Sequence, residues 1–118
     1  MVKYTQKQGR NLTVPEVGDS FTFGDAQVQF LSPSQTYSNI NDCSIVVRIT
    51  HGSNTFLFAG DAEWDAEHDM LLSGYDLSAT VLKVGHHGSD TSTSYVFLRE
   101  VMPQYAVISC GEGNSYGH

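Results

Sequence analysis

The sequence feature that most constrains the fold is a series of three short apolar runs, each followed by a turn that carries polar side chains. The first run ends at Gly60-Asp61, the second at the Gly-His-His-Gly stretch of residues 85–88, and the third at Cys110. The segments between these runs have helical spacing, so residues 56–109 are predicted to form a β-α-β-α-β unit. Because such crossovers make the strands parallel, three strand ends are expected at one edge of the sheet.

Two predicted hairpins precede this unit. Residues 20–23 and 26–31 alternate apolar and polar side chains around a Gly-Asp turn, which is typical of a hairpin with one buried face. Residues 44–50 and 54–59 are almost continuously apolar, which predicts central strands covered on both faces. The sequence therefore predicts an α/β fold with a mixed sheet, in which antiparallel hairpins come before the β-α-β-α-β unit.

The boundaries of the two helices are marked by stop signals and apolar stripes. The first stripe ends before Gly74, and its members are Trp64, His68, Leu71 and Leu72. The second helix is expected to be capped by Thr91 or Ser92 and to end at Pro103, and its stripe is Val96, Phe97, Val101 and Met102. Residues 1–19 show neither period, so we expect an irregular arm ahead of one domain that spans residues 1–118.

Charge and apolar content exclude some function classes. The 118 residues include 6 Lys and Arg against 13 Asp and Glu, a formal net charge of -7, which repels a polyphosphate backbone. A phosphate substrate would therefore need a bound divalent cation as its local positive charge. No apolar run approaches the roughly 20 residues of a membrane span, so we expect a soluble segment without membrane contact.

Potential metal ligands follow the strands of the predicted parallel unit. Asp61 follows the first strand, His86 and His87 follow the second, and residues 110–118 follow the third. Imidazole and carboxylate together suit Zn, Mn or Fe, and a carboxylate can bridge two ions. The alternative reading makes Asp61 the cap of a helix that begins near Glu63 and leaves the histidines in solvent. The metal reading predicts that Asp61 lies within reach of one imidazole.

Other polar residues near these strand ends have weaker signals. Asn114 and Tyr116 lie in a turn-rich segment and could hold either a phosphate or a ligand histidine. Together with Ser89 they are the candidate substrate-binding residues. Ser89 or Cys110 as an acyl-transfer nucleophile is disfavoured because the chain has no strand-turn-helix elbow of the G-x-S-x-G kind. Cys43 and Cys110 each adjoin an apolar run, which predicts free thiols that react slowly before unfolding.

Four motifs of this chain resemble one known family. They are Phe-Ala-Gly-Asp-Ala-Glu at 58–63, Leu-Lys-Val-Gly-His-His-Gly-Ser at 82–89, Ile-Ser-Cys-Gly at 108–111 and Asn-Ser-Tyr-Gly-His at 114–118. These motifs, with the Asn-Asp-Cys-Ser run at 41–44, are similar to the C-terminal half of a metallo-β-lactamase-fold hydrolase of the competence protein ComEC type. The resemblance covers residues 18–118.

The resemblance implies half of an αββα sandwich and a hydrolase that uses one or two Zn or Mn ions. In the competence group it implies cleavage of phosphodiesters or DNA strands, in a bacterial parent that is membrane-associated or exported. Asp61 matches the metal-bridging aspartate, and His86 matches a metal or acid-base histidine. His87 is the alternative to His86 and the candidate catalytic residue, and His118 resembles a terminal metal ligand.

The chain also departs from this family. The H-x-H-x-D-H run of the main metal cluster is missing, because the five histidines are at 51, 68, 86, 87 and 118. We therefore expect a fragment that binds metal weakly or not at all and is inactive alone. Its expected partners are the N-terminal half of the domain, a nucleic acid or phosphodiester substrate, and a second copy through an exposed sheet. Hydrolysis of a small ester, thioester or lactam, and a non-catalytic binding module, remain the alternatives.

Overall fold

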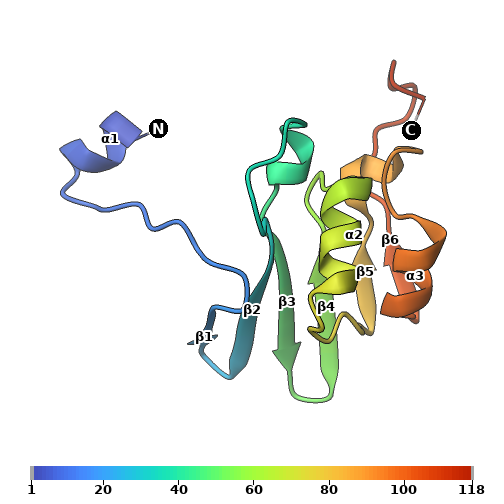
Figure 1. Ribbon diagram of the computed structural model, residues 1–118, viewed down its shortest axis with the longest axis horizontal. Helices are drawn as coiled ribbons and strands as arrows, with labels where there is room; N and C mark the ends of the chain where they lie inside the picture. Colours follow the sequence, from blue (N-terminus) through green and yellow to red (C-terminus); the bar gives the residue numbers. More distant parts are fainter. Residues whose placement is uncertain (1, 118) are drawn as a thin grey trace.

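The computed structural model describes residues 2–117, and within them a six-stranded mixed sheet carries two helices on one face (Figure 1). The strands lie side by side in chain order: β1 Ser20–Phe23, β2 Ala26–Ser32, β3 Val46–His51, β4 Asn54–Phe58, β5 Val81–Lys83 and β6 Tyr105–Val107. The helices are α1 Val2–Lys7, α2 Trp64–Leu72 and α3 Tyr95–Val101, and two 3-10 turns are η1 Asn41–Cys43 and η2 Gly85–Gly88.

The strand directions are those that the sequence predicts. β1 to β4 are successive antiparallel neighbours, whereas β4, β5 and β6 pair in parallel. The helix α2 connects β4 to β5, and α3 connects β5 to β6. The carboxyl ends of β4, β5 and β6 therefore lie at the same edge of the sheet, which is the upper edge in Figure 1.

The core lies between the sheet and the helices α2 and α3. Leu57 pairs with Leu82 in the register of β4 and β5, and both side chains are fully buried. From the helices, Met70, Phe97 and Val101 pack into the same cluster. Burial of side chains of this size stabilises the fold by about 1.5–3 kcal/mol each.

The opposite face of the sheet is also apolar, and neither α2 nor α3 covers it. Side chains alternate along a strand, so the neighbours of Leu57 and Leu82 point to this face. Phe58 is 42% exposed and Phe23 is 75% exposed. We call this surface the bare face, and by the strand register its members are Phe21, Phe23, Val28, Phe30, Val47, Ile49, Phe56, Phe58, Val81, Tyr105 and Val107. The prediction that the central strands are covered on both faces is therefore wrong for the bare face.

The buried stripe of α2 differs from the predicted one. Trp64, His68 and Leu72 are exposed, and the buried side chains are those of Ala66, Glu67 and Met70. Small residues permit α2 to lie close to the sheet, so alanine forms the contact where the apolar pattern suggested larger residues. In α3, Phe97 and Val101 are buried as predicted, but Val96 and Met102 are exposed.

Both helices begin at carboxylates supplied from elsewhere in the chain. The Asp42 carboxylate, 1% exposed, accepts hydrogen bonds from the N–H groups of Glu63 and Ala66 at the start of α2. Asp61 is therefore not the helix cap. At the start of α3 the buried Glu67 carboxylate accepts from the N–H groups of Thr93 and Ser94. Burial raises the pKa of Glu67 and outweighs the lowering by these hydrogen bonds.

The side-chain cap of α3 is Ser94 rather than Thr91 or Ser92. The Ser94 hydroxyl accepts a hydrogen bond from the Phe97 N–H at 3.3 Å. Ser92 is occupied elsewhere, because its hydroxyl donates to the Gly85 carbonyl at 2.8 Å. Serine and threonine are nearly equivalent as caps, so tertiary contacts decide which one of this Ser/Thr-rich loop caps the helix.

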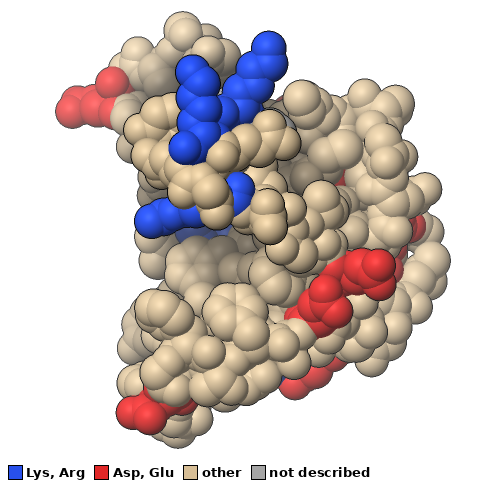
Figure 2. Space-filling view, turned by 90° about the vertical axis from the view of Figure 1, so that its left-hand side faces the viewer, with Lys and Arg blue, Asp and Glu red and all other residues tan. Residues whose placement is uncertain are grey.

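The N-terminal arm contains a short helix that the sequence period did not predict. α1 spans Val2–Lys7, and residues 8–19 have no further helix or strand. The arm carries Lys3, Lys7 and Arg10 and no acidic residue before Glu16. Figure 2 shows the basic side chains together in the upper part of the view, with acidic side chains both at its upper left and lower down. Every helix in the described range is too short and too polar to cross a membrane.

Candidate functional site

The candidate site is an open cavity at the edge where the parallel strands end. Asp61 follows β4, His86 and His87 lie in η2 after β5, and the segment after β6 forms the third side. The cavity has a volume of about 590 Å³, and its lining residues are Asp61, His86, His87, Ser109, Cys110, Gly111, Asn114 and Tyr116. The convergence expected from the strand-helix order is observed.

Asp61 pairs with His87. The Asp61 Oδ1 lies 3.5 Å from the His87 Nε2, and both side chains are about half exposed, at 46% and 51%. On the other side of the ring, the His87 Nδ1–H donates to the Ser109 carbonyl at 2.6 Å. Because a carbonyl oxygen can only accept, this contact places a proton on Nδ1 and turns Nε2 toward the carboxylate. The expected approach of Asp61 to one imidazole is therefore observed, and His87 supplies the imidazole.

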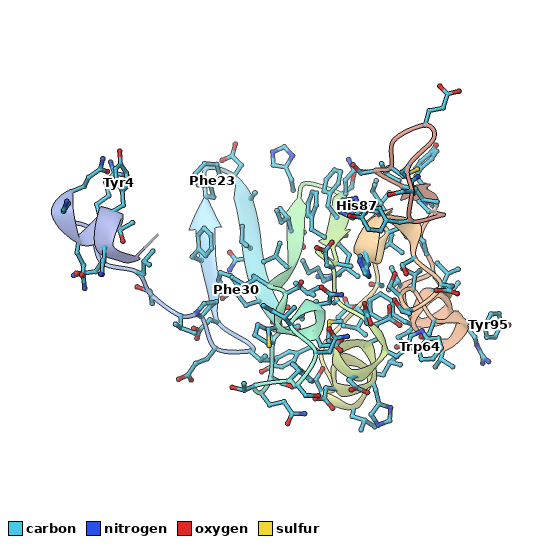
Figure 3. All side chains as sticks on the ribbon, turned by 90° about the horizontal axis from the view of Figure 1, so that it is seen from above. Tyr4, Phe23, Phe30, Trp64, His87 and Tyr95 are labelled. Carbon is cyan, nitrogen blue, oxygen red and sulfur yellow. The ribbon has the colours of Figure 1, made fainter. Side chains whose placement is uncertain are left out.

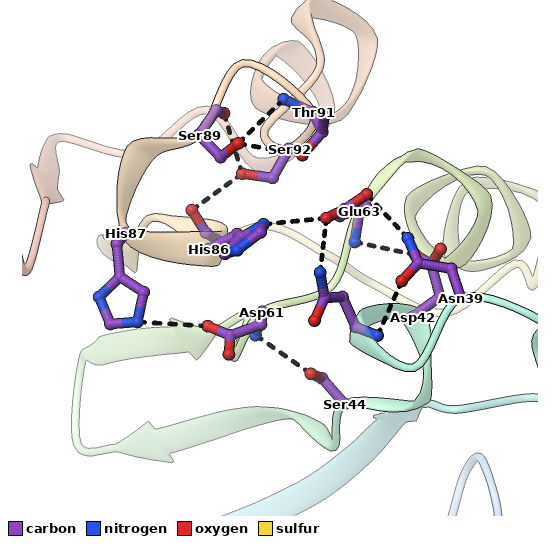
Figure 4. A network of polar contacts seen from close by, with 12 residues as sticks. Asn39, Asp42, Ser44, Asp61, Glu63, His86, His87, Ser89, Thr91 and Ser92 are labelled. Carbon is purple, nitrogen blue, oxygen red and sulfur yellow. Dashed lines mark hydrogen bonds and ion pairs between the residues drawn. The ribbon is translucent and has the colours of Figure 1, made fainter. Parts of the chain in front are cut away.

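His86 faces a different carboxylate. The His86 Nδ1 lies 2.9 Å from the Glu63 Oε1, and these side chains are 26% and 15% exposed (Figure 4). The two rings meet edge-on, with centroids 6.4 Å apart. The pair of adjacent histidines thus divides between two carboxylates, and both imidazoles line the same cavity. Their catalytic and metal-binding roles remain predictions.

The Glu63 carboxylate is the centre of a polar network. The Asn41 side-chain amide donates to Oε1 and the Asn39 amide donates to Oε2, each at 2.8 Å. Burial opposes ionisation, but the hydrogen bonds from Asn41, Thr91 and Asn39 and the nearby His86 outweigh it, and the pKa of Glu63 is lowered. Glu63 is therefore ionised at neutral pH.

The backbone of the histidine turn is held in an unfavourable conformation. His86 and His87 have φ values of 39° and 55°, in the left-handed region that non-glycine residues rarely adopt. Each such residue costs on the order of 1–3 kcal/mol. The His86 N–H donates to the Gly60 carbonyl at 3.0 Å, which ties the turn to the strand end that carries Asp61. Strain of this kind concentrates at functional sites.

The approach of Asp61 depends on Gly60 and Ser44. Gly60 has a φ of +59°, and a Cβ atom built there would lie 3.0 Å from the Ser44 Cβ. The next residue, Asp61, donates its N–H to the Ser44 hydroxyl at 3.1 Å. The chain thus passes close to the start of β3 and turns the Asp61 carboxylate toward the cavity.

The remaining predicted site residues are distributed unevenly. Asn114 and Tyr116 line the cavity, whereas the Ser89 hydroxyl lies 3.0 Å from the Thr91 hydroxyl and Ser89 is not among the lining residues. His118 lies outside the described residues. Figure 3 shows His87 on the side of the sheet edge away from Trp64.

The prediction of two slowly reacting thiols is wrong for Cys110. Both cysteines are free, but Cys110 is exposed and lines the cavity. β6 ends at Val107, earlier than the predicted strand, and the segment after it is open to solvent. Cys43 is partly buried, with its thiol 3.7 Å from the Tyr37 carbonyl, so the expectation still applies to Cys43.

Sequence reasoning assigned no role to four residues that shape this site. They are Asn39, Asn41, Asp42 and Glu63, and they join η1 to the start of α2. Only the Asn-Asp pair of η1 and the Glu two positions after Asp61 hinted at them, and neither has a spacing that predicts a long-range contact. Figure 4 shows how the network brings η1, α2 and η2 together.

Comparison with known proteins gives a consistent set of relatives, although no family model matches the chain. It is 31% identical over 119 residues to ComE operon protein 3 of Bacillus subtilis, and 43% identical over 93 residues to competence protein ComA of Neisseria gonorrhoeae. It is 39% identical over 89 residues to recombination protein 2 of Haemophilus influenzae. Its homologues include competence proteins.

These relatives are much longer than the chain. The first match covers 100% of the chain, and the other two cover 76% and 75%. The matched segment is only 15%, 13% and 11% of the three relatives. The chain therefore corresponds to a small part of each relative's length.

Proposed function

We propose that this chain is one half of a metallo-β-lactamase-type sandwich in a metal-dependent hydrolase that cleaves nucleic-acid phosphodiesters during DNA uptake. The observation that carries the proposal is the Asp61–His87 pair, 3.5 Å apart at the carboxyl edge of the parallel strands. The names of the relatives, a ComE operon protein, a competence protein and a recombination protein, support the DNA context.

The spacing of this pair suits two ligands of one ion. Zn–N and Zn–O bonds of about 2.0–2.2 Å at a tetrahedral angle place two donor atoms roughly 3.4 Å apart. The Ser109 carbonyl on Nδ1 also supplies the outer hydrogen bond that orients a ligating imidazole. Bound Zn or Mn would supply Lewis acidity and positive charge beside a phosphodiester.

The chain supplies only part of such a site. Among residues 2–117, no group of three or more His, Cys, Asp and Glu side chains is placed to hold a metal ion. A structural zinc site needs about four ligands and a catalytic one about three from the protein. We propose that the missing donors come from the remainder of the parent protein, and that Asn114 and Tyr116 contact the substrate across the cavity.

The bare face supports the sandwich. Its members extend from β1 to β6, and exposed apolar surface of this extent marks an interaction site. In a sandwich, a second sheet packs about 10 Å above the first and covers such a face. The isolated chain should then self-associate through this face, and Phe58→Lys should make it monomeric. Sedimentation of the wild type and of the variant measures the difference. A monomeric wild type would contradict this part of the proposal.

A non-catalytic binding module is the second candidate, because two donors alone do not complete a metal site. Hydrolysis of a small ester, thioester or lactam has no observation in its favour. The deciding experiment compares DNA cleavage by the parent protein with Mn²⁺ or Zn²⁺, using Asp61→Asn and the neighbouring surface variant Asp65→Asn. We expect the first to lose activity at least about 10–100-fold and the second to retain it. Full activity of Asp61→Asn would refute hydrolysis at this site.

A further inference from the structure

Glu63 occupies a helix-capping position without capping the helix. It precedes α2 with extended backbone angles, φ −113° and ψ −163°, and its side chain makes no cap hydrogen bond. Asp42 performs that task, because its carboxylate accepts from the N–H groups of Glu63 and Ala66 at 2.8 and 3.1 Å. The Glu63 carboxylate is therefore available for another role.

This carboxylate is fixed in one orientation. Asn41 donates to Oε1 and Asn39 donates to Oε2, and the Glu63 side chain is only 15% exposed. Two amide donors on two different oxygens prevent rotation about the last side-chain bond. A partly buried carboxylate also interacts more strongly with a neighbouring imidazole than an exposed one does.

His86 is held at two points. Its Nδ1 lies at ion-pair distance, 2.9 Å, from the Glu63 Oε1 without the alignment of a hydrogen bond, and its backbone N–H donates to the Gly60 carbonyl at 3.0 Å. The left-handed backbone of His86 needs such external contacts in order to persist. Together the contacts leave little freedom for the ring.

We infer that Glu63 is a positioning residue, whose carboxylate keeps the proton of His86 on Nδ1 and so makes Nε2 the nitrogen through which His86 acts in the cavity. His87 is held in the same sense, with Ser109 as the acceptor for its Nδ1–H. The two adjacent imidazoles thus use the same nitrogen, one set by a carboxylate and the other by a carbonyl. A carboxylate beside one ring nitrogen also raises the basicity of the opposite nitrogen.

This inference rests on the proposed function for what Nε2 of His86 meets, but the tautomer itself is independent of that function. The test is Glu63→Gln, with Asp65→Asn as the matched control, because Asp65 is an exposed carboxylate two residues away. Long-range ¹H–¹⁵N spectra at about pH 8.5, where imidazoles are largely neutral, identify the protonated nitrogen. We expect Nδ1–H on His86 in the wild type and in Asp65→Asn, and an increased Nε2–H fraction in Glu63→Gln.

A second variant covers a failure of Glu63→Gln to fold. Asn41→Ala keeps the carboxylate but removes one of its two anchors, so it should shift the His86 tautomer in the same direction by less. Nε2–H on His86 in the wild type, or no shift in any folded variant of the two, overturns the inference. A purely structural role of Glu63 would change stability without changing the tautomer.

Metal affinity separates the inference from the proposed function. Loss of the group that orients a ligating imidazole typically costs 10–100-fold in metal affinity. If Nε2 of His86 joins Asp61 and His87 as a ligand in the intact parent, Glu63→Gln should weaken Zn²⁺ binding there by about this factor. If neither the isolated chain nor the full parent protein binds Zn²⁺, the proposed function is wrong. The tautomer of His86 still decides the role of Glu63 in that case.

Discussion

The two faces of the sheet are built from the same strands but are completed differently. On β4, Leu57 is fully buried beneath the helices, and its neighbour Phe58 is 42% exposed on the bare face. The helix-covered face is closed by the chain itself, with Asp42 and Glu67 holding the helix starts. The bare face has apolar side chains of the same kind, and within residues 2–117 neither α2 nor α3 packs on it, although Val28 is buried there.

This difference explains why β3 and β4 carry apolar side chains on both sides, although Arg48 and Thr50 interrupt the helix-covered side of β3. A sheet with one solvated face normally alternates apolar and polar residues, and a sheet covered twice does not. The sequence thus encodes two interfaces, and the described chain completes one. The candidate site lies at the edge that these two faces share, which is consistent with a cavity that has ligands on one side only.

The largest expected effect is a contrast between neighbours on β4. Leu57→Ala should lower the free energy of unfolding by about 2–5 kcal/mol, because it leaves a cavity in the core. Phe58→Ala should cost under about 1 kcal/mol at dilutions where the isolated chain is monomeric, because the side chain is then in contact with water. Urea unfolding at such dilutions measures both. Equal losses there would contradict the contrast between the two faces.

The next effect concerns the carboxylate that holds the start of α2 on the helix-covered face. Asp42→Ala leaves the N–H groups of Glu63 and Ala66 without their acceptor, which should cost about 1–3 kcal/mol. The exposed Asp65→Ala, in the first turn of the same helix, should remain within about 0.5 kcal/mol of the wild type. The two unfolding curves would contradict this account if they coincided.

A smaller effect should separate two substitutions of one site residue. His87→Gly and His87→Ala both remove the imidazole, but only glycine adopts a φ of 55° without strain. His87→Gly should therefore be more stable than His87→Ala by about 1–2 kcal/mol. Thermal unfolding of the pair measures the difference, and a more stable alanine variant would show that the turn is not left-handed.

The smallest effect is a pH dependence on the helix-covered side. Hydrogen bonds from Tyr37 and Gln35 lower the pKa of Asp69 below 3.8 in the folded protein. The stabilisation from this carboxylate is thus present above about pH 4 and is lost as pH falls through the folded-state pKa. Asp69→Asn should flatten the loss of stability in that acid range. If the stability of the wild type and of Asp69→Asn fell equally as the pH is lowered, Asp69 would not be the source of this pH dependence.

Much of the fold follows from local sequence signals, whereas the site depends on contacts that those signals do not report. Apolar runs and turns predicted β1 to β6 and the edge where Asp61 meets the histidines. Which histidine meets Asp61 is decided by the left-handed turn and by the Ser109 carbonyl, and neither has a sequence period. Likewise, Asp42 caps α2 from 24 residues before Ala66, a separation beyond any capping rule.

The most direct test of the central claim is a calorimetric Zn²⁺ titration of the isolated chain, of Asp61→Asn and of His87→Ala. The claim is that this chain holds one side of a metal site through Asp61 and His87. It predicts weak binding by the wild type that both substitutions abolish, and no hydrolysis of bis-p-nitrophenyl phosphate. Binding that survives both substitutions, or submicromolar affinity with turnover by the isolated chain, would contradict it.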